Sequence, residues 1–207
     1  MEVYAAGCEM FNSLHSENEG VHTKAKQMKE LKVNLKEATN YLIQLFFKTN
    51  QKFSCTRTKV GKLLSIVAFK YAFQDTRIFD EIIYRYPPNC GTLIKDLMLF
   101  IPRDVYIRDV SLGDNDSCNI ISEGFSCCID IPAQYKDVGT IPGEVKDEIE
   151  KVFKLFGAYP ASDLGSLLNP IVEQVVVEPS DKIELEKLKN ISVDVEDNPI
   201  IKYLCEQ

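Results

Sequence analysis

A chain of 207 residues, 45% of them hydrophobic and 27% charged, has the composition of an ordinary globular protein. At this length a protein buries about 70% of the surface that its unfolded chain exposes, so folding needs no disulfide or metal site. The net charge of −7 disfavours a protein that coats nucleic acid, because phosphate binding requires a basic surface.

The cysteines and the absence of long apolar runs indicate the cell interior. Seven cysteines at irregular spacing are an odd number and do not match the disulfide framework of a small secreted domain. No charged-then-apolar leader opens the sequence, and no apolar run reaches the ~20 residues of a membrane span. We therefore expect a soluble, cytoplasmic protein with free thiols and no membrane association.

Charge is distributed unevenly along the chain. There is no acidic residue between Glu37 and Asp75, where six Lys or Arg residues lie. From residue 144 onward, 14 acidic residues stand against 7 lysines. Solvated surfaces that aid solubility explain both features. The functional alternative is that the basic stretch steers an acidic partner toward the protein.

Residues 1–33 are predicted to be an N-terminal extension, because the segment 12–20 is polar and poor in core residues. The first helix is predicted over residues 34–49 with Asn34 as its N-cap. Apolar residues recur there at the i, i+3, i+4, i+7 spacing of one helical face. They are Ala38, Tyr41, Leu42, Leu45 and Phe46.

A second helix is predicted to begin at Thr56 or Thr58, either of which is a suitable N-cap. Its expected core stripe consists of Val60, Leu63, Leu64, Val67, Ala68 and Tyr71. Three lysines lie off that stripe and are expected to point to solvent: Lys59, Lys62 and Lys70.

The middle of the chain predicts extended structure and one further helix. Residues 78–85 are rich in β-branched and aromatic side chains and are expected to form a strand or an extended segment. Pro87 and Pro88 exclude helix at that point. The next helix is predicted to begin at Pro88, Asn89 or Thr92 and to run through Leu97 and Met98. Pro102 ends it.

The rest of the chain is expected to contain a strand pair and two helices. Residues 105–131 predict a hairpin or an inserted pair of strands around the turn at 113–116. Helices are predicted over residues 144–155, with Gly157 as the C-terminal cap, and over residues 161–168. Residues 172–177 fit a strand or a helix end.

These elements predict an α+β fold, a mostly helical domain over residues 34–170 with a small β-hairpin or short sheet. An acidic C-terminal segment, residues 171–207, follows. Two roles stay open for it: it completes the domain, or it contacts a partner.

Motifs for catalysis and metal binding are missing. The only two histidines, His15 and His22, lie in the polar extension, so a rigid Cys-His dyad is not expected. The one close cysteine pair, Cys127-Cys128, lacks the two- to four-residue spacing of zinc ligands. No phosphate-binding loop, dinucleotide fingerprint, zinc-protease motif or calcium loop is present. We expect no enzymatic activity, no metal and no cofactor.

Three stretches resemble a known family. Residues 58–68 (TKVGKLLSIVA) and 79–88 (FDEIIYRYPP) are similar to the Panacea domain, which includes SocA-like antitoxins and many phage-associated proteins. Residues 156–169 (FGAYPASDLGSLLN) resemble the family's C-terminal motif. The resemblance covers about residues 34–170. It departs where the family's Tyr-Gly-Pro turn is Tyr86-Pro87-Pro88 and its Thr-His ending is Leu168-Asn169.

The resemblance implies an antitoxin that neutralises a toxin by direct binding or hands the toxin to a protease. Two alternatives stay open: a phage or mobile-element protein that inhibits a host factor, and a DNA-binding autoregulator that uses the basic stretch. Nucleic-acid binding is the weaker expectation because the whole chain is acidic. The predicted partner-binding residues are Lys59, Lys62, Tyr84, Arg85 and Tyr86.

Overall fold

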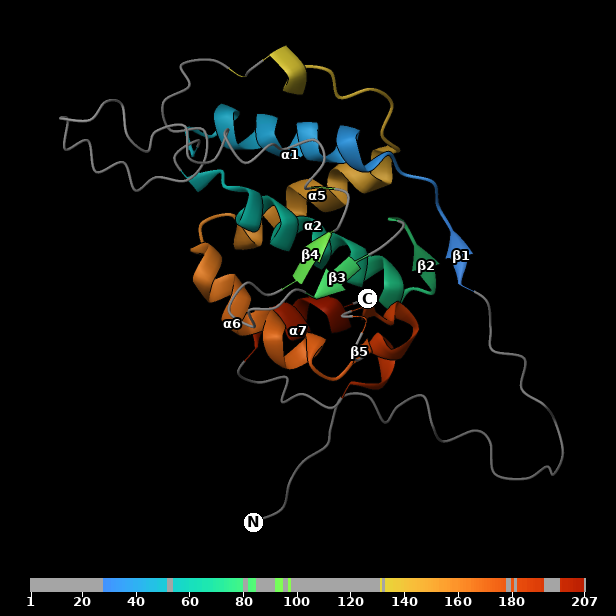
Figure 1. The fold of residues 1–207 in the computed structure, drawn as a ribbon. Helices are drawn as coiled ribbons and strands as arrows, with labels where there is room; N and C mark the ends of the chain where they lie inside the picture. Colours follow the sequence, from blue (N-terminus) through green and yellow to red (C-terminus); the bar gives the residue numbers. More distant parts are fainter. Residues whose placement is uncertain are drawn as a thin grey trace, which may run out of the picture.

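Helix α2 (Arg57–Phe73) runs through the centre of the molecule (Figure 1). The computed structural model describes residues 28–51, 54–79, 82–84, 92–94, 97, 131, 133–177, 180, 182–191 and 198–206. Every residue from Lys59 to Ala72 is buried, so α2 has no solvent-facing side over that stretch. A helix that is enclosed in this way must be covered by several other elements.

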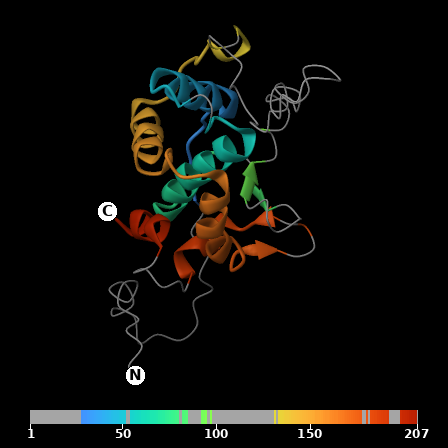
Figure 2. The ribbon, with the colours of Figure 1, turned by 90° about the vertical axis from the view of Figure 1, so that its left-hand side faces the viewer.

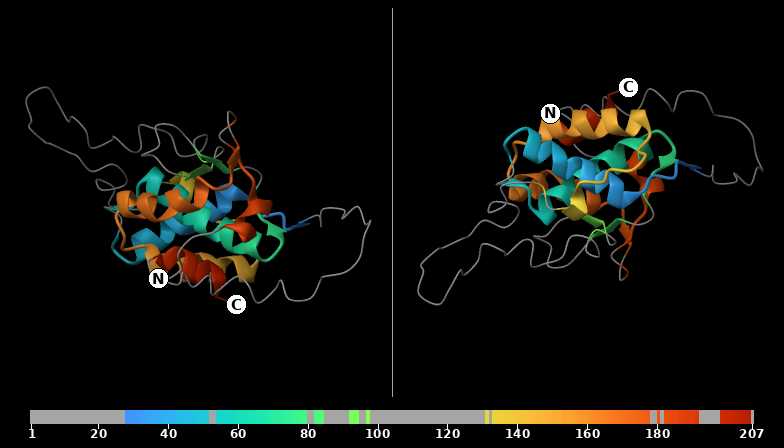
Figure 3. Two further views of the ribbon diagram at one scale, coloured as in Figure 1. Left: turned by 90° about the horizontal axis from the view of Figure 1, so that it is seen from below. Right: turned by 90° about the horizontal axis from the view of Figure 1, so that it is seen from above.

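Those elements surround α2 in layers. Helices α1 (Leu35–Lys48) and α5 (Gly143–Phe156) cover one side, and the four-stranded sheet lies on the other side (Figure 2). Helices α6 (Ala161–Val172) and α7 (Pro199–Cys205) pack against α2 as well. Views along the vertical axis show α5 at the edge of the molecule beside α7 (Figure 3).

Side-chain caps fix where the first helices begin. The Asn34 side chain accepts hydrogen bonds from the backbone N–H groups of Lys36 and Glu37, which confirms the predicted start of α1. The Thr56 hydroxyl accepts from the N–H of Lys59, so Thr56 is the cap of α2. Gly157 follows the last residue of α5 and its N–H donates to the Phe153 carbonyl, as expected for the C-terminal cap.

Two small sheets complete the α+β fold that the sequence predicts. Strand β1 (Lys29–Glu30) pairs in parallel with β2 (Thr76–Arg77). The second sheet is antiparallel and has the order β4-β3-β6-β5. Its strands are β3 (Ile82–Tyr84), β4 (Thr92–Ile94), β5 (Val176–Val177) and β6 (Lys182–Ile183).

The predicted strand within 78–85 is present as β3, but the helix predicted after it is wrong at its start. Thr92–Ile94 is a strand that pairs with β3, because Thr92 and Ile94 are β-branched residues whose side chains are both buried against α2. The predicted strand pair at 105–131 lies outside the described residues, apart from residue 131.

Described residues beyond residue 170 pack into the same core as the helices before them. Helix α6 continues through Pro170 to Val172. The 3-10 helix η5 (Leu185–Asn190) buries Leu185 and Leu188 against α2. Four residues of α7 are buried in that core: Ile200, Ile201, Tyr203 and Leu204.

At the N-terminal end, residues 28–33 also belong to the fold, through the pairing of β1 with β2. Residues 1–27 of the expected extension lie outside the described part of the chain. No helix of the described residues has the length and hydropathy that crossing a membrane would require.

Candidate functional site

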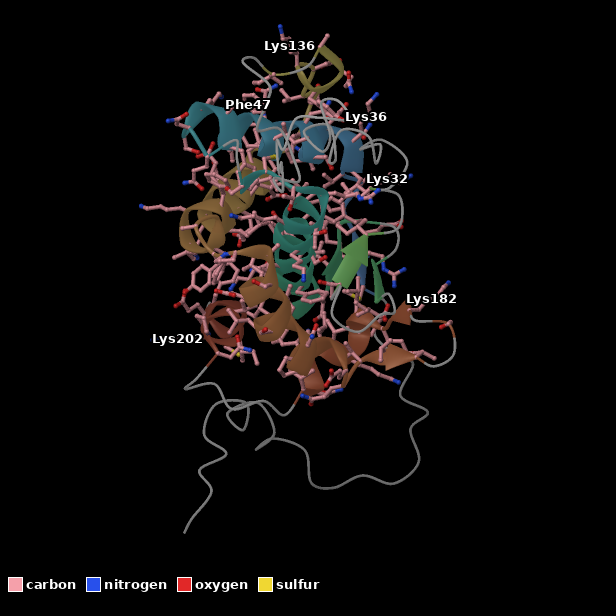
Figure 4. All side chains as sticks on the ribbon, turned by 60° about the vertical axis from the view of Figure 1, so that its left-hand side comes forward. Lys32, Lys36, Phe47, Lys136, Lys182 and Lys202 are labelled. Atoms are coloured by element: carbon pink, nitrogen blue, oxygen red, sulfur yellow. The ribbon has the colours of Figure 1, made fainter. Side chains whose placement is uncertain are left out.

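The structure contradicts the predicted exposure of the α2 lysines. Lys59 is 3% exposed and Lys62 is 1% exposed, so neither can contact a partner directly. Lys70 is 5% exposed. Outer elements carry the lysines that do point to solvent, among them Lys36 and Lys202 (Figure 4). Of the other predicted residues, Tyr84 is the last residue of β3, and Arg85 and Tyr86 lie outside the described residues.

Lys59 lies near the start of α2, between α1 and Cys55. Its Nζ atom is 5.5 Å from the centre of the Phe46 ring, a geometry in which the ammonium is attracted to the ring face. Burial lowers the pKa of Lys59, and the nearby Cys55 opposes that shift. The aromatic ring therefore offsets part of the cost of placing this side chain in the core.

Lys62 extends from α2 toward α6. A methyl group built on Gly165 of α6 would lie 2.5 Å from the Lys62 Nζ atom, which is closer than atoms in contact can approach. Gly165 is thus the residue that leaves space for the lysine, and the two helices pack against each other at this point.

Lys70 closes the C-terminus of α7. Its Nζ atom donates hydrogen bonds to the carbonyl oxygens of Tyr203 at 2.9 Å and Leu204 at 3.4 Å, and to that of Glu206. The last carbonyls of a helix have no partner within the helix and carry partial negative charge. A buried ammonium that binds several of them therefore joins α2 to α7.

A cluster of polar side chains surrounds this junction, between α2, α5 and α7. The Tyr203 ring has the Lys70 Nζ atom 5.0 Å and the Lys151 Nζ atom 5.1 Å from its centre. The Phe156 ring meets it edge-on at 5.6 Å. Within the described part of the chain, the Tyr203 hydroxyl and the Glu148 Oε1 atom are buried without a hydrogen-bond partner.

Burial shifts the pKa values of the ionisable groups in this cluster. It raises the pKa of Glu148, against the opposing effects of Lys151 and Lys70. It lowers the pKa of Lys70, partly offset by Glu148. Burial together with the carboxylates of α5 raises the pKa of Tyr71 to about 12.

A carboxyl group with a raised pKa beside an amine with a lowered pKa is a pattern found in acid–base catalysis. Here the amine is that of Lys70, and its N–H groups donate hydrogen bonds to backbone carbonyls at the end of α7. No group of three or more His, Cys, Asp or Glu side chains among the described residues is arranged to hold a metal ion. The contacts of this cluster join α2, α5 and α7.

The opposite side of α5 is joined to α1. The Tyr41 hydroxyl donates a hydrogen bond to Glu150, and the Lys146 Nζ atom lies 5.7 Å from the Tyr41 ring centre. Burial and the Glu150 carboxylate raise the pKa of Tyr41 to about 12. Both flanks of α5 are thereby fixed, and its outer side faces solvent.

Side-chain amides of α1 hold the segment that precedes α5. The Asn40 Nδ2 atom donates to the Asp137 carbonyl at 2.6 Å, and the Gln44 Nε2 atom donates to the Lys136 carbonyl at 2.8 Å. This segment contains the 3-10 helix η4 (Ala133–Tyr135), in which Tyr135 is buried. Asn40 and Gln44 therefore hold this segment against α1.

Sequence reasoning missed the role of α7, although the signals were present. Asn198 followed by Pro199 is a typical helix start, and the Asn198 side chain does accept from the N–H groups of Ile200 and Ile201. The apolar spacing of this helix is correct for one buried face. The capping of α7 by a lysine 133 residues earlier has no local signal.

Comparisons with protein-family models, with curated proteins and with solved structures each gave no match for this chain. The Panacea resemblance therefore stays a prediction from the motifs at residues 58–68 and 79–88. The first motif lies in α2, where Lys59 and the residues after it are buried, and residues 82–84 of the second motif form β3.

Lys70→Met should lower the free energy of unfolding by about 1–3 kcal/mol, because it leaves carbonyls at the end of α7 without a partner while keeping side-chain length. Urea unfolding followed by circular dichroism measures the change. Lys202→Met, on the exposed side of the same helix, is the control and should stay within about 0.5 kcal/mol of wild type. Equal stabilities for the Lys70 variant and wild type would contradict the capping role.

Glu148→Gln should change how stability depends on pH. The raised pKa means that the folded protein retains a proton on Glu148 above pH 4.5, where the unfolded chain loses it. The resulting stabilisation is complete below pH 4.5 and is lost as the pH rises through the folded-state pKa. Glutamine does not ionise, so the free energy of unfolding of the variant does not fall in this way. The variant should therefore gain stability relative to wild type as the pH rises.

Urea unfolding at several pH values from about 4 to about 8 gives this difference directly. Asp147→Asn removes an exposed carboxylate of the same helix and serves as the control. A stability difference between Glu148→Gln and wild type that does not vary with pH would contradict the burial of this carboxyl group.

Proposed function

We propose that the protein is a non-catalytic protein-binding module of the antitoxin type, which neutralises a toxin by direct binding or hands it to a protease. The observation that carries the proposal is the register of the β3–β4 pair. Tyr84 pairs with Thr92, so the two ends of the segment 85–91 are brought together at the end of a paired hairpin. Arg85 and Tyr86 open that segment.

The two strands that flank this segment in the sequence are held firmly in the fold. Strand β3 is paired on both sides, with β4 and with β6. Strand β4 rests on the central helix, where Thr92 is 0% and Ile94 is 1% exposed. Loops that start from rigid elements lose little conformational entropy on binding, and Tyr and Arg are enriched in binding hot spots.

Burial of the α2 lysines weakens the DNA-binding alternative. Three of the six basic residues between Glu37 and Asp75 are in the core, so they cannot neutralise phosphates. The protein-binding proposal does not depend on them. It places the protein in the cytoplasm, where thiols such as that of Cys55 stay reduced.

Co-expression with the product of the adjacent reading frame tests the proposal. The neighbouring protein should arrest growth when expressed alone, and it should co-purify with this chain when the two are expressed together. A neighbour that is harmless alone and does not co-purify would contradict the antitoxin function. A neighbour that co-purifies without being toxic would instead favour a mobile-element protein that inhibits another factor.

Arg85→Glu combined with Tyr86→Ala should weaken binding of that partner by at least about 100-fold, the effect of losing two hot-spot side chains. Lys202→Glu on α7 is the control and should bind as wild type does. Calorimetry on purified components measures both affinities. Unchanged affinity in the folded double variant would exclude the end of the β3–β4 hairpin as the contact surface.

A further inference from the structure

Four charged residues form a stripe along the outer side of α5: Glu144, Asp147, Lys151 and Lys154. Their 3-4-3 spacing returns to the same side of a helix with 3.6 residues per turn. All four are exposed, and the buried residues of α5 lie on the opposite side of the helix. The stripe is acidic in its first half and basic in its second half.

Intramolecular electrostatics explain only part of this order. The helix dipole favours an acid in the first turn and a base in the last, which accounts for Glu144 and Lys154, but its effect fades beyond those turns. Asp147 and Lys151 have the spacing of an ion pair within the helix. No ion pair between them occurs in the described structure, where the Lys151 Nζ atom lies over the Tyr203 ring.

An antiparallel second copy of α5 fits the stripe. When two copies of one helix pack antiparallel about a two-fold axis, residue numbers rise along one copy and fall along the other. The numbers of any two residues that face each other therefore add up to the same total. The sum 298 places Glu144 opposite Lys154 and Asp147 opposite Lys151, and each pairing occurs twice. The four charges of the stripe, which spans about 15 Å of helix, then face charges of opposite sign.

A third pair fits the same register. Leu155 is 46% exposed and is the exposed large hydrophobic residue of the described structure. Its facing position in the second copy is Gly143, where an added Cβ atom would contact nothing within 4 Å in the single chain. Gly143 therefore offers space above the backbone for the Leu155 side chain of the other copy.

We propose that the protein forms a two-fold symmetric homodimer through the outer sides of two antiparallel α5 helices. Helix α5 lies at the edge of the molecule, so a second copy can approach it (Figure 3). The proposed partner-binding hairpin lies across α2 from α5, so self-association and partner binding use different surfaces (Figure 2). Exposed ion pairs are weak, so the dimer should dissociate as salt is raised.

Charge reversal tests the dimer directly. Glu144→Lys with Asp147→Lys gives a chain whose stripe is entirely basic, and Lys151→Glu with Lys154→Glu gives one whose stripe is entirely acidic. Each variant alone should self-associate at least about tenfold more weakly than wild type, because every facing pair becomes repulsive. A mixture of the two should form a heterodimer.

Analytical ultracentrifugation at low salt measures these equilibria, and circular dichroism checks that each variant is folded. The single change Glu144→Lys and the compensating pair Glu144→Lys with Lys154→Glu form a second test that leaves Lys151 on the Tyr203 ring. The single variant should associate more weakly and the compensated variant should recover. A monomeric wild type, variants that still dimerise, or a mixture without heterodimer would each overturn the proposal.

These outcomes are separate from those that bear on the proposed function. The α5 variants should retain wild-type affinity for a partner that binds the β3–β4 hairpin. Loss of the dimer model therefore leaves the protein-binding proposal standing, and the reverse also holds.

Discussion

Burial of α2 on every side is the constraint on which the rest of the structure depends. From Lys59 to Ala72 no residue of this helix faces solvent, so elements from both ends of the chain are required to cover it. Three lysines in that stretch would be costly to bury without partners. The Phe46 ring lies beside the Lys59 ammonium, and Gly165 leaves space for the Lys62 side chain. The backbone carbonyls of α7 accept hydrogen bonds from Lys70.

This arrangement changes how the charge of the chain relates to its function. The sequence between Glu37 and Asp75 has no acidic residue and predicts a basic surface. Half of its basic residues, however, are buried in the core. Exposed lysines such as Lys36 and Lys202 lie instead on the helices that cover α2. The polar interior is occupied in joining the helices of the protein to one another.

Local patterns predicted the parts of the fold that local physics determines. The α1 start at Asn34, helix α5, and strand β3 follow from caps, periodicity and β-branched residues. The helix expected at Thr92 became a strand because pairing with β3 outweighs propensity in so short a segment. The sequence predicts that the α2 lysines are exposed, because charged side chains usually point to solvent. They are buried because apolar residues surround them on all sides of the helix. Contacts such as Lys70 with α7 join residues far apart in sequence and leave no local trace.

The rate at which each lysine reacts with an amine-directed reagent tests the burial of α2 most directly. Brief acetylation of the native protein, read by mass spectrometry, should modify Lys59, Lys62 and Lys70 at least about tenfold more slowly than Lys36 and Lys202, since reaction in the core requires local opening. A lysine whose pKa is lowered reacts faster when it is accessible, so slow labelling of Lys59 and Lys70 can only reflect burial. Equal rates for the two groups would contradict the central position of α2.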